Sequence, residues 1–369
     1  MIYLDNGATS FHKPGAVYRA VQRAITTCAN PGRGGYRAAM EAARQVYNCR
    51  VAAGELFHCA PEQVVLTTSC THGLNIAIRS LVKPGSTVVI SGFEHNAVTR
   101  PLHALGAEII VAGRRLFDWE DTIYSFRKAL DNGAKTAIFT HVSNVFGYVL
   151  PIRELAALCR ERGIPFIIDG AQSAGTIPID FSQLQADFLA MPGHKGLLGP
   201  QGTGLLLCRD GGEPLLYGGT GSESIRQQMP DFLPDRLEAG TLNVPGFAGL
   251  AEGIRYVGKT GEQNIFRREH EQLEACVHGL RKLGMKVFAG EHQAGTLSFL
   301  LGQDCEEAAE LLAKQGIAVR AGLHCAPFAH ESAGTLETGT VRVSFGIDAG
   351  KHQTQALLRA ASKLLPYKP

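Results

Sequence analysis

Short apolar runs alternate with amphipathic segments between residues 64 and 208, and no other feature of the sequence limits the fold as strongly. The apolar runs are four or five residues long and lack polar alternation, as is typical of strands that are covered on both faces. The segments between them repeat apolar residues at helical spacing. This alternation predicts an α/β domain with a mostly parallel central sheet. The expected strands are 64–68, 87–91, 108–111, 136–140, 165–169, 188–191 and 204–208, and the expected helices are 74–82, 98–105, 123–130 and 152–162.

A second, smaller region is predicted after the turn-rich stretch 214–245. Its strands and helices are mixed without the regular alternation of the first region, which suits an α+β domain. We therefore expect a large domain at 15–250 and a small domain formed by 1–14 together with 251–369. The further elements expected are helices at 38–56, 265–283, 306–315 and 353–365, and strands at 296–301 and 341–345.

The composition argues against several classes of partner and site. The 36 Lys and Arg residues nearly balance the 34 Asp and Glu residues, so no nucleic-acid surface built on net charge is expected. No apolar stretch reaches the roughly 18 residues of a membrane span, so no membrane partner is expected. The nine cysteines are scattered without C-x-x-C spacing, which argues against a metal site and favours reduced thiols in a cytoplasm-like compartment.

Two of the predicted strands end in polar residues, at the place where open α/β sheets bind ligands. Asp169 ends the strand at 165–169, where a carboxylate removed from water needs a cation or a hydrogen-bond donor. A helix-capping aspartate is the alternative. Lys195 lies in the glycine-rich run 193–196, and a lysine there can form a Schiff base with an aldehyde if its environment lowers its pKa. A solvated loop lysine is the alternative.

A third strand end, residues 67–73, carries Ser and Thr and leads directly into a helix. Free backbone N–H groups at a helix start, together with hydroxyls, can hold a phosphate, although a simple N-cap would give the same pattern. The three strand ends together supply what pyridoxal phosphate (PLP) requires. Its aldehyde needs a lysine, its pyridinium nitrogen an anion, and its phosphate several donors. The combination is much more specific than any one of its members.

The sequence resembles the class V, fold-type I PLP enzymes and, within them, the cysteine desulfurases and selenocysteine lyases. The resemblance covers essentially the whole chain. It implies a large domain with a central, mostly parallel seven-stranded sheet and a smaller α+β C-terminal domain. The motifs, in the family's order, are Tyr3-Leu-Asp5-Asn6-Gly-Ala8-Thr9, Glu94-His95-Asn96, Ser143-Asn144-Val-Phe-Gly147, Asp169-Gly-Ala-Gln172-Ser, Gly193-His194-Lys195, Glu238-Ala-Gly240-Thr241-Leu-Asn243 and Arg320-Ala-Gly322-Leu-His324-Cys325-Ala.

The resemblance implies specific roles around the cofactor. Lys195 would hold PLP covalently and then move protons, and Asp169 would keep the pyridine nitrogen protonated. Gln172 would contact the phenolic oxygen, and His95 would stack on the ring face and take part in catalysis. The other cofactor-binding residues that the resemblance implies are Cys70, Thr71 and His194 at the phosphate, Asn144, and Thr241 of a neighbouring subunit, so a homodimer is expected.

The resemblance also implies a nucleophile and a substrate site. The Cys325 thiolate would attack the sulfur of the substrate, leaving alanine and a persulfide; a buried structural cysteine is the alternative. Asn144 and Arg342 would hold the substrate carboxylate, for which the planar fork of Arg342 is suited. Arg320 and His324 belong to the same substrate-binding set and could favour the thiolate.

The chain departs from the family's common pattern near this site. Pro192 stands where a phosphate-binding serine is common, His72 replaces a common glutamate, and Leu323 replaces a common histidine. Residues 319–327 contain Gly and Pro without periodicity, so a loop is expected around Cys325.

We therefore expect a cytoplasmic, homodimeric, PLP-dependent enzyme that removes sulfur from cysteine, or selenium from selenocysteine, and passes it to an acceptor protein. An aminotransferase or another C–S lyase with the same cofactor is the first alternative. A PLP-binding sulfur-transfer partner without turnover is the second. The sequence does not separate sulfur from selenium, because both substrates present the same carboxylate and amine.

Overall fold

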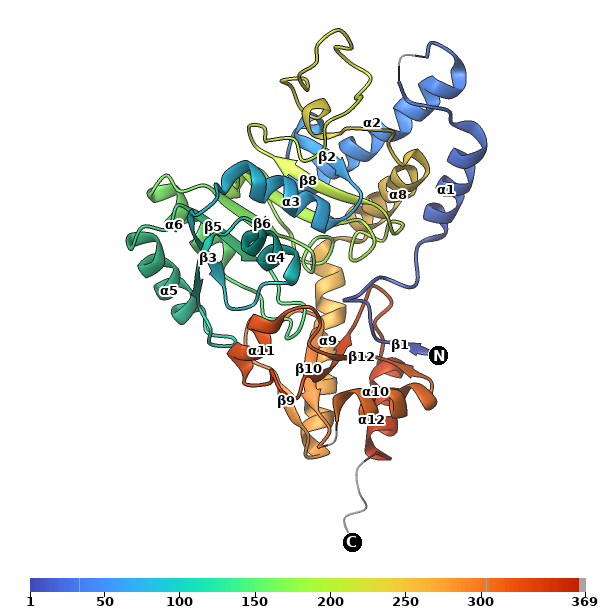
Figure 1. Cartoon of the computed structure of the whole chain (residues 1–369). Helices are drawn as coiled ribbons and strands as arrows, with labels where there is room; N and C mark the ends of the chain where they lie inside the picture. Colours follow the sequence, from blue (N-terminus) through green and yellow to red (C-terminus); the bar gives the residue numbers. More distant parts are fainter. Residues whose placement is uncertain (33, 303, 365–369) are drawn as a thin grey trace.

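A seven-stranded sheet lies at the centre of the computed structural model, which describes residues 1–32, 34–302 and 304–364 (Figure 1). The strand order is β2-β8-β7-β6-β5-β3-β4, and β8 runs antiparallel to both of its neighbours. The mostly parallel sheet is confirmed, and each predicted strand agrees with an observed one to within one residue at either end. The strands are β2 (Val64–Thr67), β3 (Thr87–Ser91), β4 (Glu108–Ala112), β5 (Thr136–Thr140), β6 (Phe166–Asp169), β7 (Phe188–Pro192) and β8 (Gly204–Cys208).

Helices cover both faces of this sheet, which explains why its strands are apolar throughout. Ile167 joins a buried cluster with α3 and α4, whereas its neighbour Ile168 joins the cluster that includes α2, α5 and α6, because side chains alternate across a strand. Among the described residues, no helix is both long enough and apolar enough to cross a membrane. The helices are α2 (Arg37–Phe57), α3 (Cys70–Leu81), α4 (Asn96–Ala104), α5 (Trp119–Asp131), α6 (Ile152–Glu161) and the short α7 (Phe181–Leu184).

Two further helices that the sequence analysis did not predict, α1 (Gly15–Thr27) and α8 (Val244–Thr260), contact each other beside α2. Glycines weaken the helical signal of α8 because glycine has a poor helix propensity. The packing nevertheless requires them. A Cβ atom at Gly253 would collide with the backbone oxygen of Leu197, and one at Gly249 would lie 2.6 Å from a methyl group of Val21.

The C-terminal region contains a four-stranded antiparallel sheet in the order β12-β13-β10-β9. Its apolar residues share a buried cluster with α9, α10 and α12. Near the N-terminus, β1 (Ile2–Tyr3) pairs in parallel with β11 (Ile317–Ala318), so the start of the chain lies against the C-terminal region. The other elements are β9 (Lys286–Phe288), β10 (Thr296–Leu300), β12 (Arg320–Gly322), β13 (Thr340–Ser344), α9 (Glu262–Lys282), α10 (Cys305–Lys314), α11 (Pro327–Ala333) and α12 (Lys351–Ser362).

Several local predictions differ from the structure, and α5, for example, begins at Trp119 instead of residue 123. The expected loop 319–327 contains β12, whose three residues are too few to produce a periodic pattern. Helix α3 begins at Cys70, four residues before the predicted start, because its first turn is polar and lies outside the apolar repeat. The last helix ends at Ser362, before the predicted end at residue 365, which lies outside the described residues.

A buried ion pair anchors the segment between β8 and α8. The Nη1 and Nη2 atoms of Arg50 donate to the two carboxylate oxygens of Glu238 at 2.7 and 2.6 Å. The backbone N–H of Leu66 also donates to Glu238, which joins this segment to β2. Burial raises the pKa of Glu238, and the adjacent Arg50 charge opposes that rise.

Replacing Glu238 with alanine should lower the free energy of unfolding by about 3–5 kcal/mol, because Arg50 is left buried without its partner. Urea unfolding followed by circular dichroism measures the loss. The control is Glu252→Ala, which breaks an exposed pair with Arg255 and should cost less than about 1 kcal/mol. Equal small losses in the two variants would contradict the prediction.

Candidate active site

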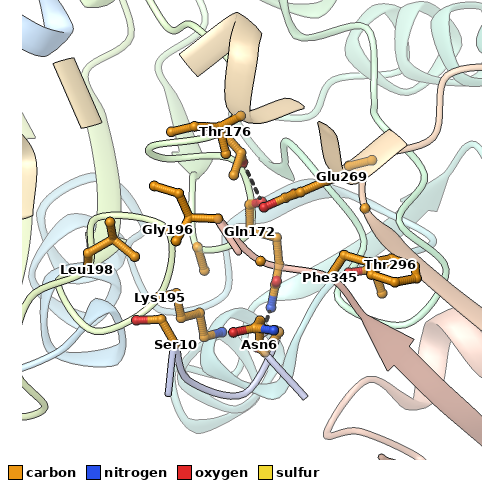
Figure 2. Close-up of a pocket in the computed structure, with 17 residues that line it drawn as sticks. Asn6, Ser10, Gln172, Thr176, Lys195, Gly196, Leu198, Glu269, Thr296 and Phe345 are labelled. Carbon is orange, nitrogen blue, oxygen red and sulfur yellow. Dashed lines mark hydrogen bonds between the residues drawn. The ribbon is translucent and has the colours of Figure 1, made fainter. Parts of the chain in front are cut away.

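Lys195 follows β7 in the glycine-rich loop of residues 193–196. A hydrogen bond from Gly193 N to Thr203 O (2.8 Å) holds the base of this loop. The lysine side chain extends into a pocket that Asn6 and Gln172 also line (Figure 2). Within the described residues, no hydrogen bond engages its Nζ atom, and burial is the main cause that lowers its pKa. A lysine in this state is suited to attack an aldehyde carbon.

Asp169 ends β6 on the same edge of the sheet and is 2% exposed. Its Oδ1 atom accepts hydrogen bonds from the backbone N–H of Ala171 (2.9 Å) and from the Cys70 thiol (3.5 Å). Burial raises the pKa of Asp169, while the Ala171 N–H and the Lys195 charge act against that rise. Within the described residues, Oδ2 receives no hydrogen bond, so one carboxylate oxygen is left for a ligand.

The start of α3 lies beside Asp169. Ser69 caps the helix by accepting a hydrogen bond from His72 N at 3.1 Å. The backbone N–H groups of Cys70 and Thr71 have no partner among the described residues, as expected for the first turn of a helix. A Cβ atom at Gly204 would lie 2.7 Å from the carbonyl carbon of Ser69, so glycine is required for β8 to support this loop closely. The arrangement suits a bound anion.

His95 lies at the N-terminus of α4, and its Nδ1 atom accepts a hydrogen bond from Ala97 N at 3.0 Å. This bond places the ring proton on Nε2. Burial, together with the positive charges of Lys195 and Arg320, lowers the pKa of His95 to about 4. The imidazole is therefore neutral near pH 7. A neutral imidazole can lie with its flat face against an aromatic ring.

The N-terminal segment closes over the Lys195 loop. The backbone oxygen of His194 accepts hydrogen bonds from Ser10 N (2.9 Å) and from Thr9 Oγ1 (3.1 Å). The Nδ1 atom of His194 lies 3.0 Å from Thr9 Oγ1, and burial lowers the pKa of this histidine to about 4. Gln172 donates from Nε2 to Gly7 O at 3.0 Å. The residues expected near the phosphate and the phenolic oxygen therefore meet at this segment.

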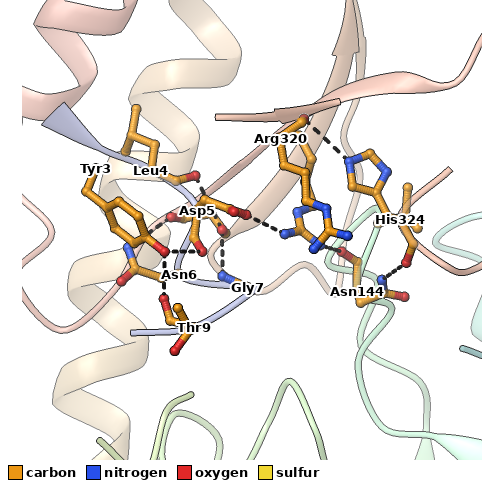
Figure 3. A network of polar contacts seen from close by, with 12 residues as sticks. Tyr3, Leu4, Asp5, Asn6, Gly7, Thr9, Asn144, Arg320 and His324 are labelled. Atoms are coloured by element: carbon orange, nitrogen blue, oxygen red, sulfur yellow. Dashed lines mark hydrogen bonds and ion pairs between the residues drawn. The ribbon is translucent and has the colours of Figure 1, made fainter. Parts of the chain in front are cut away.

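Arg342 lies on β13 and is 2% exposed. It contacts Asp5 and Asn144, two members of the polar network that Figure 3 shows. Its Nη2 atom is 2.6 Å from Asp5 Oδ1, and its Nη1 atom donates to Asn144 O at 3.0 Å. The Nε atom of Arg342 and the Oδ1 atom of Asn144 are buried without a partner among the described residues. Buried groups of this kind normally have hydrogen bonds, so the vacant donor indicates a place for an anionic ligand.

Cys325 is exposed on a tight turn near this network. A hydrogen bond from Ala326 N to Leu323 O (2.9 Å) closes the turn. The two central residues, His324 and Cys325, have φ angles of 52° and 57°, a left-handed conformation that costs about 1–3 kcal/mol per non-glycine residue. Two further bonds hold the turn to the site, from Asn144 Nδ2 to His324 O (2.8 Å) and from the Asn96 backbone N–H to Cys325 O (2.7 Å).

His324 was expected to favour the thiolate form of Cys325, but the structure buries its side chain. Burial, the Arg342 charge and the neighbouring His330 lower the pKa of His324 to about 2, so its imidazole is neutral at physiological pH. Its Nε2 atom lies 3.4 Å from Arg320 O, and its Nδ1 atom has no partner among the described residues. A positive charge beside the turn therefore comes from the exposed Arg320.

Thr241 does not join this cluster within the chain. It is exposed and lines a separate cavity with Asn30, Tyr47 and Arg50. The structure therefore brings together ten of the eleven other residues singled out around Lys195 and Asp169 and leaves Thr241 on a different surface. The ten are Cys70, Thr71, His95, Asn144, Gln172, His194, Arg320, His324, Cys325 and Arg342.

The chemistry of these donors fits PLP. Lys195 has an amine without a hydrogen bond, Asp169 has a free carboxylate oxygen, and the first turn of α3 has unpartnered N–H groups. Lys195, Asp169 and the α3 loop would hold the aldehyde, the ring nitrogen and the phosphate respectively, with His95 against the ring.

Comparison with known proteins decides the family. The sequence model described as aminotransferase class-V matches residues 2–357. The chain belongs to the class V aminotransferase family. The resemblance inferred from the motifs is therefore confirmed, together with the PLP fold-type I architecture and dependence on PLP that characterise this family.

Relatives of this class V protein carry consistent names. It is 32% identical over 362 residues to a probable cysteine desulfurase of Methanothermobacter thermautotrophicus, and the match covers 93% of this chain and 89% of the relative. An apo cysteine desulfurase structure from Thermococcus onnurineus NA1 has a TM-score of 0.91 at 30% identity, covering 99% and 94% of the two chains. A cysteine desulfurase structure from Escherichia coli has a TM-score of 0.86 at 25% identity, covering 99% and 95%.

Sequence reasoning did not assign a role to Asp5, although it lies in a motif that was singled out. Its ion pair with Arg342 joins positions 337 residues apart, and no local pattern predicts such a contact. Glu269 of α9 was also missed. It is buried in the wall of the Lys195 pocket, where burial and the nearby Asp348 raise its pKa to about 8. One glutamate among several charged residues of an amphipathic helix gave no signal for this position.

Proposed function

We propose that this class V protein is a PLP-dependent cysteine desulfurase, which takes the sulfur of L-cysteine as a persulfide on Cys325 and releases L-alanine. The observation that carries the proposal is the exposed Cys325 thiol on a turn that Asn144 and Asn96 hold to the Lys195 site. The names of the relatives support the same activity.

The chain's own residues divide the reaction between them. Arg342 binds the substrate carboxylate through its vacant Nε–H, while Asp5 and Asn144 O fix the plane of the guanidinium. Bound PLP withdraws electrons from the amino acid and so weakens its bonds. The Cys325 thiolate attacks the substrate sulfur; an S–S bond forms, the C–S bond breaks, and its electron pair stays on carbon. The Lys195 amine takes up the α-proton of the amino acid, and the ammonium group so formed then delivers the proton that this carbon requires.

The direct test is to incubate the purified protein with L-cysteine and quantify the products. We expect equal amounts of alanine and of sulfide or protein persulfide. Pyruvate with ammonia would instead identify a C–S lyase, and a new amino acid formed only with a 2-oxo acid would identify an aminotransferase. No response of the visible spectrum to any amino acid would overturn enzymatic turnover altogether.

The proposal extends to L-selenocysteine, because the two substrates share the carboxylate that Arg342 would bind and the amino group that would react at the Lys195 site. Selenium is the better leaving group, so its release depends less on Cys325. Assaying both substrates with the same preparation separates a desulfurase from a selenocysteine lyase.

We also propose a homodimer in which Thr241 of each subunit reaches the partner's phosphate site. Large apolar side chains are exposed at the start of α2, along it and in the segment before α8, as at Tyr36, Met40, Tyr47, Leu216 and Tyr217. Thr241 lies in the same part of the molecule, in a cavity that includes Tyr47. An exposed apolar surface of this kind supports a subunit interface.

Subunit exchange tests the dimer. Thr241→Glu places a negative charge where the partner's phosphate would bind, so the variant should bind PLP at least about ten-fold more weakly. Lys195→Ala removes the reactive amine. Mixed dimers of the two variants contain one intact site and should recover up to half of the wild-type activity per dimer. No recovery, or a monomer in light scattering, would contradict the arrangement.

We propose two domains formed by 15–250 and by 1–14 with 251–369, a division that falls within α8 (Val244–Thr260). The nine unpaired thiols support a reducing, cytoplasmic location. The exposed position of Cys325 supports transfer of its persulfide sulfur to the thiol of an acceptor protein.

A further inference from the structure

No step of the proposed reaction uses the Cys70 thiol. Its Sγ atom is 3.5 Å from Asp169 Oδ1, although the two residues are 99 positions apart. The sequence assigns Cys70 only to the phosphate loop. The structure places its side chain instead at the carboxylate that would hold the ring nitrogen.

The thiol is the donor in this contact. Burial is the main cause that raises the pKa of Cys70 well above its ordinary value, and the Asp169 charge raises it further. The sulfur therefore keeps its proton, and a carboxylate accepts the hydrogen bond. Cys70 is 8% exposed, which also makes it unsuited to act as a nucleophile or to receive sulfur.

Two donors meet the same oxygen of Asp169. Ala171 N and the Cys70 thiol both contact Oδ1, and within the described residues no hydrogen bond reaches Oδ2. Rotation of the carboxylate about its Cβ–Cγ bond would cost both bonds. The pair of donors therefore fixes the carboxylate with Oδ2 left for another partner.

We propose that Cys70 is a positioning residue for Asp169, whose Oδ2 it directs to the PLP ring nitrogen. The inference deepens the proposed function, but it rests on the cofactor alone and not on the release of sulfur. A packing role is the alternative, because Cys70 also belongs to an apolar cluster with Leu74 and Ala190. Packing alone would favour an apolar replacement over a polar one.

Two substitutions separate these roles. Cys70→Ser keeps a donor to Asp169, whereas Cys70→Ala removes it. If Cys70 positions Asp169, the dissociation constant of PLP for the apo protein should rise about five-fold in Cys70→Ala and stay within about two-fold in Cys70→Ser. The visible absorption maximum of the bound cofactor should move in Cys70→Ala only.

Cys208 provides a matched control, because it is a buried cysteine of the same cluster whose Sγ atom faces a backbone oxygen, that of Leu206. Cys208→Ala should leave PLP binding and the absorption maximum unchanged. Weaker binding in Cys70→Ser than in Cys70→Ala, or wild-type binding in Cys70→Ala, would overturn the proposal in favour of packing.

Infrared spectroscopy of the apo protein gives a readout that needs neither cofactor nor turnover. The difference between wild type and Cys70→Ala isolates the S–H stretch of Cys70, which should lie below the frequency of a free thiol. In Asp169→Ala the acceptor is lost, and the band should move to higher frequency. An unmoved band overturns the hydrogen bond. Failure to release sulfur from cysteine would refute the desulfurase proposal and leave both of these readouts intact.

Discussion

Replacing Cys325 with alanine is expected to lower the release of sulfur from cysteine by about 10³-fold or more, with PLP still bound. Cys325 is the exposed one of the nine cysteines, and six of the others are buried. A methyl group cannot attack the substrate sulfur, and no neighbouring thiol is accessible to replace the missing one. Alanine formation and the mass of a protein persulfide measure the loss.

Cys28→Ala is the control for this substitution, because Cys28 is partly exposed and lies in a different part of the chain. Its activity should match the wild type. With selenocysteine, the Cys325→Ala variant should keep a larger fraction of its rate, since selenium leaves more easily. Persulfide formation at the wild-type rate in Cys325→Ala would show that another group is the nucleophile.

Replacing Lys195 with alanine should abolish turnover and remove the covalent bond to PLP. Within the described residues the amine has no hydrogen bond, and burial lowers its pKa, which favours the neutral amine that reacts with an aldehyde. Without it, the visible band of the covalently bound cofactor should disappear. Gel filtration should then separate PLP from the protein.

The conservative variant Lys195→Arg keeps the positive charge and tests whether charge alone is sufficient. It should behave like Lys195→Ala, because a guanidinium does not form the covalent bond. The pKa of Lys195 adds a second measurement. Arg320 is one of the charges that lower it, so Arg320→Ala should raise the Lys195 pKa and move the acidic limb of the activity profile to higher pH. A wild-type spectrum in Lys195→Ala would refute the assignment.

Local patterns predicted most of the fold because strands and helices are marked by the spacing of apolar residues within each segment. Strands such as Thr87–Ser91 and Gly204–Cys208 are continuous apolar runs bounded by turns, and the structure reproduces them. Asp169 and Lys195 follow such runs, and parallel strands end on one edge of a sheet, so their proximity follows from topology. Helix α8 was missed because its glycines are selected by contacts with other elements, and α8 therefore lacks a strong helical signal of its own.

The sequence alone determined the α/β architecture, the family, the cofactor and the identity of the residues at the strand ends. The architecture follows from the spacing of the apolar runs, the cofactor from the polar residues at three strand ends, and the family from the motifs that resemble it. Only the tertiary structure decided that Asp5 pairs with Arg342, that the Cys70 thiol meets Asp169, and that burial keeps His324 neutral. It also decided that Cys325 stands on a left-handed turn. These features depend on contacts between distant segments and on removal from water, which no run of neighbouring residues encodes.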